Sequence, residues 1–169
     1  LLTTVLSLST MWAKYHYEDL REFSRDAEGW GYDAVEANAY VKSHEMLERL
    51  AAGPLPISSL HNPIPNLQSS RNMRSYDLNL AATDEGERQE AIGFARDSIL
   101  NAARLGSRAV VLHMGHVPIG KAMQRRLHEM WHDGMMGTDE YRQLYERITT
   151  LRAEGEQRHL DRALQTLRD

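Results

Sequence analysis

The chain has 169 residues, of which 41% are hydrophobic and 26% charged, as in an ordinary globular domain with one sizeable core. Its net charge of −4 argues against nonspecific attraction to nucleic acid or anionic lipid, and no run reaches the roughly 18 apolar residues of a membrane span. The absence of cysteine excludes disulfides and thiolate metal sites and fits a reducing cytoplasm, which is the location we expect.

The first predicted elements are a strand and a helix. Residues 4–10 (TVLSLST) are short, rich in β-formers and partly alternating, which favours a strand. A helix over residues 18–30 is predicted because apolar residues recur there at helical spacing, namely Leu20, Phe23, Ala27 and Trp30. Gly31 is expected to end it.

The same order then repeats. Residues 33–38 (DAVEAN) form the second predicted strand, and Ser43 is a plausible N-cap for the helix that follows. That helix carries Met46, Leu47, Leu50 and Ala51 and ends at Gly53. Residues 57–61 (ISSLH) form the third strand, and a long proline-bearing loop comes after it, whose length hints at function.

A long helix and a fourth strand come next. Asp84 is expected to cap the helix, with Glu87 as its capping-box partner. One apolar stripe is predicted along it, made of Ile92, Ala95, Ile99, Ala102, Ala103 and Leu105. After Gly106, residues 108–113 (RAVVLH) form the most apolar strand, which we expect to be buried.

The remainder is predicted to be helical from about Ile119, with an interruption at residues 134–137. Thr138 can cap a second stretch, which carries Tyr141, Leu144, Tyr145, Ile148 and Leu151. A separate last stretch is expected to carry Leu160, Ala163, Leu164 and Leu167.

Strands that alternate with helices argue for parallel pairing, because a parallel crossover is long and usually helical. The predicted fold class is therefore α/β, of the (β/α) TIM-barrel type. We expect one domain over residues 1–169, with about four βα units in 1–117 and a helical segment in 118–169. A complete barrel typically needs about 250 residues, so a half barrel or a truncated barrel is expected. The first residue is Leu1 and not Met, which also leads us to expect a fragment.

Polar residues follow three of the four predicted strands. Glu36 and Asn38 end the second, His61 and Asn62 the third, and His113 the fourth. In barrels the catalytic groups lie at the carboxyl ends of the strands, and a carboxylate with two imidazoles could bind a divalent metal or transfer protons. A single histidine at a strand end is more often structural, so only the coincidence across strands favours a site.

Three segments carry a family resemblance: GWGYDAVEAN, ISSLHNPIPN and AARLGSRAVVLHMG. In this order they resemble the second to fourth strand regions of the sugar phosphate isomerase/epimerase-like (xylose isomerase-like TIM barrel) family, over roughly residues 5–117. The resemblance implies the N-terminal half of such a barrel. It implies that His61 and His113 face the active site as substrate or metal contacts, and that Glu36 contacts substrate or supports them.

The activity implied by this resemblance is isomerisation or epimerisation of a small sugar or sugar phosphate, assisted by a divalent metal through an enediolate. The ion would be Mn, Mg, Co or Zn, with His61 and His113 among its ligands. The family takes its principal metal ligands from later strands, so the main ligands are expected outside this chain.

Further substrate contacts are expected from residues that follow the strands. These are Asn38, Asn62, Trp12, His16 and Lys121. Trp12 and His16 could wall a pocket after the first strand, and Lys121 could hold a substrate phosphate as a point charge. An ordinary surface lysine is the simpler interpretation of Lys121.

Three other functions stay open. An endonuclease IV-like phosphodiesterase would have the same fold, but the net negative charge of the chain argues against a nucleic-acid partner. A non-catalytic half barrel could assemble with a partner or with itself, since open sheet edges invite pairing, so a homo-oligomer is possible. His128, Glu129 and His132 fit the zinc-peptidase pattern H-E-x-x-H, with Glu154 as a possible late third ligand. Thr138 stands where the extended pattern has its third histidine, and solvated helix residues are the favoured interpretation.

Overall fold

The computed structural model describes residues 5–169. The chain forms two compact units, and each is described below by itself. The first contains the residues up to 78 and residues 86–113, and the second contains residues 79–85 and 114–169. The division into 1–117 and 118–169 drawn from the sequence lies near this boundary, and the assignment of a single domain stays a prediction.

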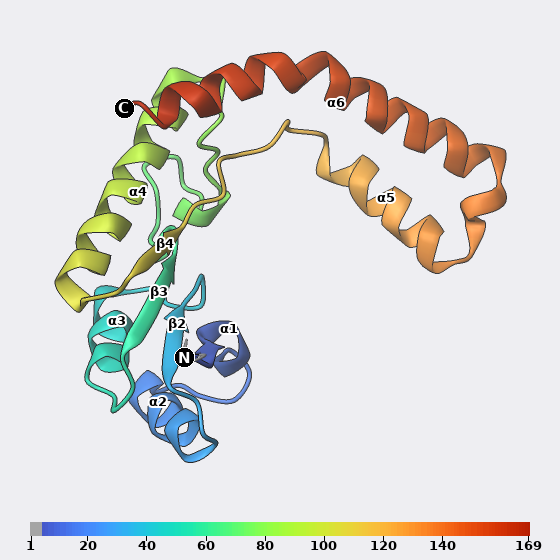
Figure 1. Ribbon diagram of the computed structural model, residues 1–169. Coiled ribbons are helices and arrows are strands. Elements are labelled where there is room, and N and C mark those ends of the chain that lie inside the picture. The colour runs from blue at the N-terminus through green and yellow to red at the C-terminus, as the bar shows by residue number, and fades with distance from the viewer. Residues whose placement is uncertain (1–4) are drawn as a thin grey trace. The chain divides into compact units, whose positions relative to one another are not determined.

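The first unit is built on a parallel sheet of four strands, β1 (Ser7–Ser9), β2 (Ala34–Ala37), β3 (Ile57–His61) and β4 (Ala109–Val111). Their order is β1-β2-β3-β4 and each neighbouring pair is parallel. Leu8 lies opposite Val35, and Leu60 lies opposite Val110. The predicted α/β class, with four parallel strands that alternate with helices, is therefore confirmed (Figure 1).

Helices connect these strands, namely α1 (Thr10–Ala13), α2 (Leu20–Gly29), α3 (His44–Ala51) and α4 (Glu85–Leu105), with a short 3-10 turn η1 (Ser75–Asp77). Two caps explain where helices begin. The Asp19 side chain accepts from the backbone amide of Arg21 at the start of α2. At the start of α3, the Ser43 hydroxyl accepts from the backbone amide of Met46 at 3.1 Å, which confirms the predicted cap.

The first strand is shorter than predicted. Of the residues assigned to it, Thr4 lies outside the described part of the chain, and Thr10 begins α1 instead of ending the strand. Two contacts account for this change. The Ser9 side chain caps α1. The buried Thr10 hydroxyl accepts a hydrogen bond from the backbone amide of Asn38 at 2.8 Å. Thr10 thereby ties the end of β1 to the end of β2.

The core of the first unit lies between the sheet and its helices. Leu20, Phe23 and Ala27 recur at helical spacing on α2, so one face of that helix is buried against the sheet. Val35 and Leu60 supply the strand side, and both are fully buried. Because successive strand residues point to opposite faces, Glu36 and His61 lie on the other face of the sheet.

The predicted stripe on α4 is wrong in part. Ile92, Ala95 and Ala102 are buried, but Ile99 is 49% exposed, and the buried position next to it is Ser98. The Ser98 hydroxyl accepts from the Ile64 amide at 2.9 Å and donates to Asn62 Oδ1 at 3.0 Å. These hydrogen bonds between Ser98 and the segment after β3 therefore determine which face of α4 points inward.

The prediction that the fourth strand is buried is also wrong. Val110 packs against the core, but Val111 is 37% exposed and Ala109 is exposed as well. Within residues 5–169, β4 pairs only with β3. The apolar run AVV therefore forms an edge strand of the described sheet.

The second unit is a helical hairpin of α5 (Lys121–His132), a 3-10 turn η2 (Met135–Gly137) and α6 (Asp139–Thr166), seen in Figure 1. The Thr138 hydroxyl accepts from the Tyr141 amide at 3.2 Å, which confirms the predicted cap. The two separate helical stretches expected after Thr138 are one continuous helix. None of the helices in the described residues is long and apolar enough to cross a membrane.

Close backbone approaches hold this second unit together. A Cβ atom at Gly155, in the middle of α6, would lie 2.6 Å from Val117 Cγ1, so the absence of a side chain lets that segment reach the helix. Gly115 has φ +114°, and a Cβ atom there would meet the Ala81 amide nitrogen at 2.7 Å. His159 on α6 donates from Nδ1 to the Ala81 carbonyl at 2.6 Å. Ala81 is thereby attached both to the segment before α5, at Gly115, and to α6, at His159.

Candidate functional site

Two histidines meet at the carboxyl ends of β3 and β4. His61 is the last residue of β3, and His113 follows β4 by two residues. Their Nε2 atoms lie 2.5 Å apart, and their rings stack with centroids 4.7 Å apart. Neighbouring parallel strands end at the same sheet edge, and this brings together two residues that are 52 positions apart.

Glu36 on β2 and Asn38, the residue that follows β2, hold the position of the His61 ring. Asn38 donates from Nδ2 to Glu36 Oε1 at 3.0 Å, and the same amide nitrogen lies 3.0 Å from His61 Nδ1. Glu36 Oε1 is 3.9 Å from His61 Nδ1. The Ser59 hydroxyl donates to Glu36 Oε2 at 3.3 Å. We call these five residues, Glu36, Asn38, Ser59, His61 and His113, the histidine network.

The hydrogen bonds fix the tautomer of His61. Asn38 Oδ1 accepts from the Ala39 amide at 2.7 Å, so its Nδ2 is the group that faces His61. Since this amide nitrogen can only donate, His61 Nδ1 must accept, and a neutral His61 carries its proton on Nε2. That proton points at His113 Nε2. The two imidazoles are therefore joined by a hydrogen bond in which His61 Nε2 donates and His113 Nε2 accepts.

The surroundings favour the neutral form of His61. Its side chain is 20% exposed. Burial is the largest cause that lowers the pKa of His61 from its ordinary value of 6.5, and the neighbouring His113 lowers it further. The Glu36 carboxylate acts in the opposite direction and does not outweigh the other two. The neutral form of His61 agrees with the tautomer that its hydrogen bonds require.

The lowered pKa predicts a pH dependence of stability. Between the ordinary value of 6.5 and the lower folded pKa, the unfolded chain binds more protons on His61 than the folded chain does. The free energy of unfolding should therefore fall as the pH is lowered through this window. Urea unfolding at several pH values would measure it, with His61→Gln as the comparison. The variant should lose less stability over the same range, and an unchanged pH dependence would contradict the assigned cause.

The histidine network offers two imidazoles and one carboxylate, which are residue types that bind divalent ions. In this structure the Nε2 atoms of His61 and His113 face each other in a hydrogen bond. Among residues 5–169, no group of three or more His, Asp, Glu or Cys could hold a metal ion. Metal ligation by these two histidines stays a prediction.

Three of the predicted substrate contacts in the first unit, Asn62, Trp12 and His16, have partners outside the histidine network. Asn62 is buried, and its Oδ1 accepts from Ser98 on α4. Trp12 stacks on His16 at 4.3 Å and meets Trp30 edge-on at 5.1 Å. Of the predicted substrate-binding residues in this unit, only Asn38 joins the histidine network, and the roles of the others stay predictions.

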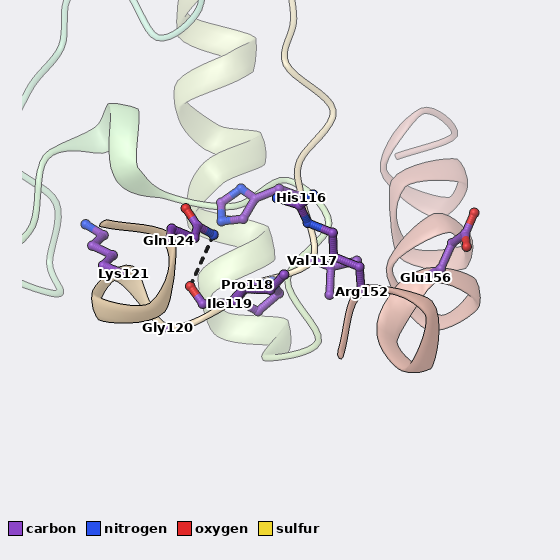
Figure 2. Close-up of a pocket in the computed structure, with 9 residues that line it drawn as sticks. All are labelled: His116, Val117, Pro118, Ile119, Gly120, Lys121, Gln124, Arg152 and Glu156. Carbon is purple, nitrogen blue, oxygen red and sulfur yellow. Dashed lines mark hydrogen bonds between the residues drawn. The ribbon is translucent and has the colours of Figure 1, made fainter. Parts of the chain in front are cut away.

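Lys121 lies in the second unit, where it lines an open pocket of about 960 Å³. Figure 2 shows it at the start of α5, while Arg152 and Glu156 come from α6. Gln124 closes part of the wall by donating to the Ile119 carbonyl at 3.4 Å. Two cationic side chains, Lys121 and Arg152, line this pocket, and the predicted phosphate contact of Lys121 stays a prediction.

Two features of the histidine network were not predicted. Ser59 was not singled out, although it precedes His61 by two residues and so shares its face of the strand. Asn38 was expected to bind substrate, and its bridge between Glu36 and His61 was not foreseen. The alternation of β3 could have identified Ser59, but no sequence pattern signals the Asn38 bridge.

The chain was compared with family models, curated proteins and solved structures. No protein-family model matches the chain, and neither does any curated protein. Among solved structures, the chain is similar to one described as "Crystal structure of D-tagatose 3-epimerase-like protein", at 21% identity and a TM-score of 0.49. The match covers 85% of this chain and 49% of that one, so the chain spans about half the length of the protein it matches.

Proposed function

We propose that the histidine network forms part of the active site of an isomerase or epimerase that acts on a small sugar or sugar phosphate. The observation that carries the proposal is the contact between His61 and His113, at the carboxyl ends of neighbouring parallel strands. Enzymes built on (β/α) barrels place their reacting groups at this edge. The family resemblance of the segments that contain both histidines supports a sugar as the substrate.

The chemistry proposed for the pair is proton transfer at substrate oxygens. In such a reaction a base takes the proton from the carbon beside a carbonyl, the electron pair forms a carbon–carbon double bond, and the carbonyl oxygen gains negative charge. A neutral imidazole that donates a hydrogen bond to this oxygen stabilises the enediolate, and it can supply the proton that the oxygen takes up. Return of a proton to carbon then completes the isomerisation or epimerisation.

The two histidines have different proposed roles. His113 is the more exposed of the pair, so we assign it the direct contact with substrate oxygens. His61 lies behind it, where Asn38 and Glu36 hold its orientation and tautomer. His61 then acts as a positioning residue: its Nε2 donates to His113 Nε2, which leaves the proton of His113 on Nδ1, where it can reach a substrate oxygen.

A divalent ion such as Mn²⁺, Mg²⁺, Co²⁺ or Zn²⁺ belongs to the proposal only as a group whose main ligands would lie outside residues 1–169. The residues of the histidine network do not complete such a site as they are arranged. The proton transfer proposed here for His113 therefore involves only its imidazole and the substrate oxygens.

Exchange with solvent deuterium tests the proposal. A small panel of ketoses, aldoses and their phosphates would be incubated in D₂O with the natural protein that contains this chain, with divalent ions supplied. If the protein forms an enediolate, one substrate should gain deuterium at the carbon beside its carbonyl, and NMR would detect it.

A further inference from the structure

A second pair of histidines lies in the last turn of α5. His128 and His132 are four residues apart, so they lie on the same side of the helix. Their Nε2 atoms are 3.1 Å apart, and their ring centroids are 4.4 Å apart at 86°. Both side chains are exposed, so an ion in solvent can reach them.

This separation matches a chelating pair. Two imidazole nitrogens bound to one Zn²⁺ at about 2.0–2.1 Å lie about 3.3 Å apart in tetrahedral geometry, and about 2.9 Å apart at a right angle. The 3.1 Å between the Nε2 atoms of His128 and His132 falls between these two values. An ion could therefore replace the proton between the rings with only small movements of the side chains.

The remaining contacts leave the pair free to take this role. Within residues 5–169, neither imidazole has a hydrogen bond except the one to the other ring, so each can carry its proton on Nδ1 and offer Nε2 to an ion. Trp131 packs against both rings, stacked on His128 at 6.2 Å and edge-on to His132 at 4.9 Å. The indole thus limits the side-chain conformations of both histidines.

The end of the helix adds a favourable field. His132 is the last residue of α5, and the C-terminal turn of a helix attracts cations because its carbonyl groups point outward. Asp133 follows as the C-cap residue. Arg126, two residues before His128, pairs with Glu140 on α6 at 2.9 Å, so its charge is partly neutralised.

We propose that His128 and His132 form a surface site for a borderline transition metal ion, with Zn²⁺ as the probe. The two Nε2 atoms are its protein ligands, and water fills the remaining positions. Imidazole ligands prefer such ions over Mg²⁺ and Ca²⁺, which take oxygen ligands. Because no third His, Asp, Glu or Cys among the described residues completes a metal-binding group with this pair, the site is a two-point chelate and not the zinc centre of a peptidase.

Calorimetric titration of the whole chain with ZnCl₂ in excess Mg²⁺ tests the proposal. We expect one equivalent of Zn²⁺ that disappears, or binds at least about tenfold more weakly, in both His128→Ala and His132→Ala, because one imidazole loses the advantage of two joined ligands. His44→Ala removes an exposed histidine from the first turn of α3 and should keep this equivalent.

Two checks separate the proposal from unfolding of the helix. Alanine favours helix more than histidine does, so both variants should keep their far-UV circular dichroism. In the unaltered chain, Zn²⁺ should shift the NMR signals of the His128 and His132 rings together and should raise Tm, since only the folded helix holds the pair in place. An unaltered chain that binds no Zn²⁺, or folded variants that bind the same equivalent with less than about a tenfold loss of affinity, would overturn the proposal.

Discussion

Replacement of His113 by alanine is expected to lower kcat by about 10²–10⁴-fold, the range that a positioned acid–base group contributes. The loss should appear mainly in kcat, because the imidazole is proposed to stabilise the charge that develops on the substrate oxygen during the reaction. Tm should change little, since His113 is exposed and follows β4 outside the core. Steady-state kinetics and thermal unfolding of the same preparation would measure both quantities.

His44→Ala is the matched control for this variant. It makes the same chemical change at an exposed position that has no contact with the histidine network. Its kcat should equal that of the unaltered protein. If His113→Ala instead kept full turnover and lost thermal stability, His113 would be a structural residue and the proposed site would be wrong.

Leu60→Ala is expected to have the opposite pattern. Leu60 is fully buried between the sheet and its helices, one residue before His61. Truncation of a buried leucine leaves a cavity and typically lowers the free energy of unfolding by about 2–5 kcal/mol. Because Leu60 points away from the histidine network, turnover per folded molecule should change much less than in His113→Ala. Urea unfolding, with kinetics below the transition, would measure the two effects.

Ile99→Ala supplies the comparison for Leu60→Ala. Ile99 is 49% exposed on α4, so its truncation opens no cavity and should change the free energy of unfolding by no more than about 0.5 kcal/mol. Equal losses in the two variants would contradict the burial of Leu60 against the sheet.

The sequence predicted the sheet well because local patterns determine strands and caps. The short apolar runs around Val35, Leu60 and Val110 all became strands, in the predicted parallel order. Ser43 and Thr138 capped the expected helices through contacts only three residues long. Such signals lie within one turn of chain, so they can be seen without the tertiary structure.

The errors came from contacts between distant parts of the chain. Thr10 does not belong to the first strand as predicted, because its hydroxyl accepts a hydrogen bond from the backbone amide of Asn38. Ile99 was assigned to the inner face of α4, where the contacts of Ser98 with Asn62 and Ile64 decide the orientation. The predicted break before the last helical stretch did not occur, and α6 runs unbroken through Gly155, beside which Val117 packs. Periodicity alone contains none of this information.

The candidate site was predicted in outline only. The rule that parallel strands end at one edge suffices to bring Glu36, His61 and His113 together. It does not predict that Asn38 bridges Glu36 to His61, because that depends on side-chain rotamers. The tautomer of His61 follows from this bridge, and so does the direction of its hydrogen bond to His113. The chemical function of the pair stays a proposal.

Deuterium exchange in D₂O tests the central claim most directly, because it follows the proton whose transfer we propose. With a sugar or sugar phosphate that the natural protein accepts, deuterium should appear at the carbon beside the carbonyl. The exchange should slow by about 10²–10⁴-fold in His113→Ala and not in His44→Ala. If an intact, metal-supplied protein exchanged no proton of any sugar tested, or if His113→Ala exchanged at the full rate, the isomerase proposal would be contradicted. A non-catalytic half barrel would then be the better account of the chain.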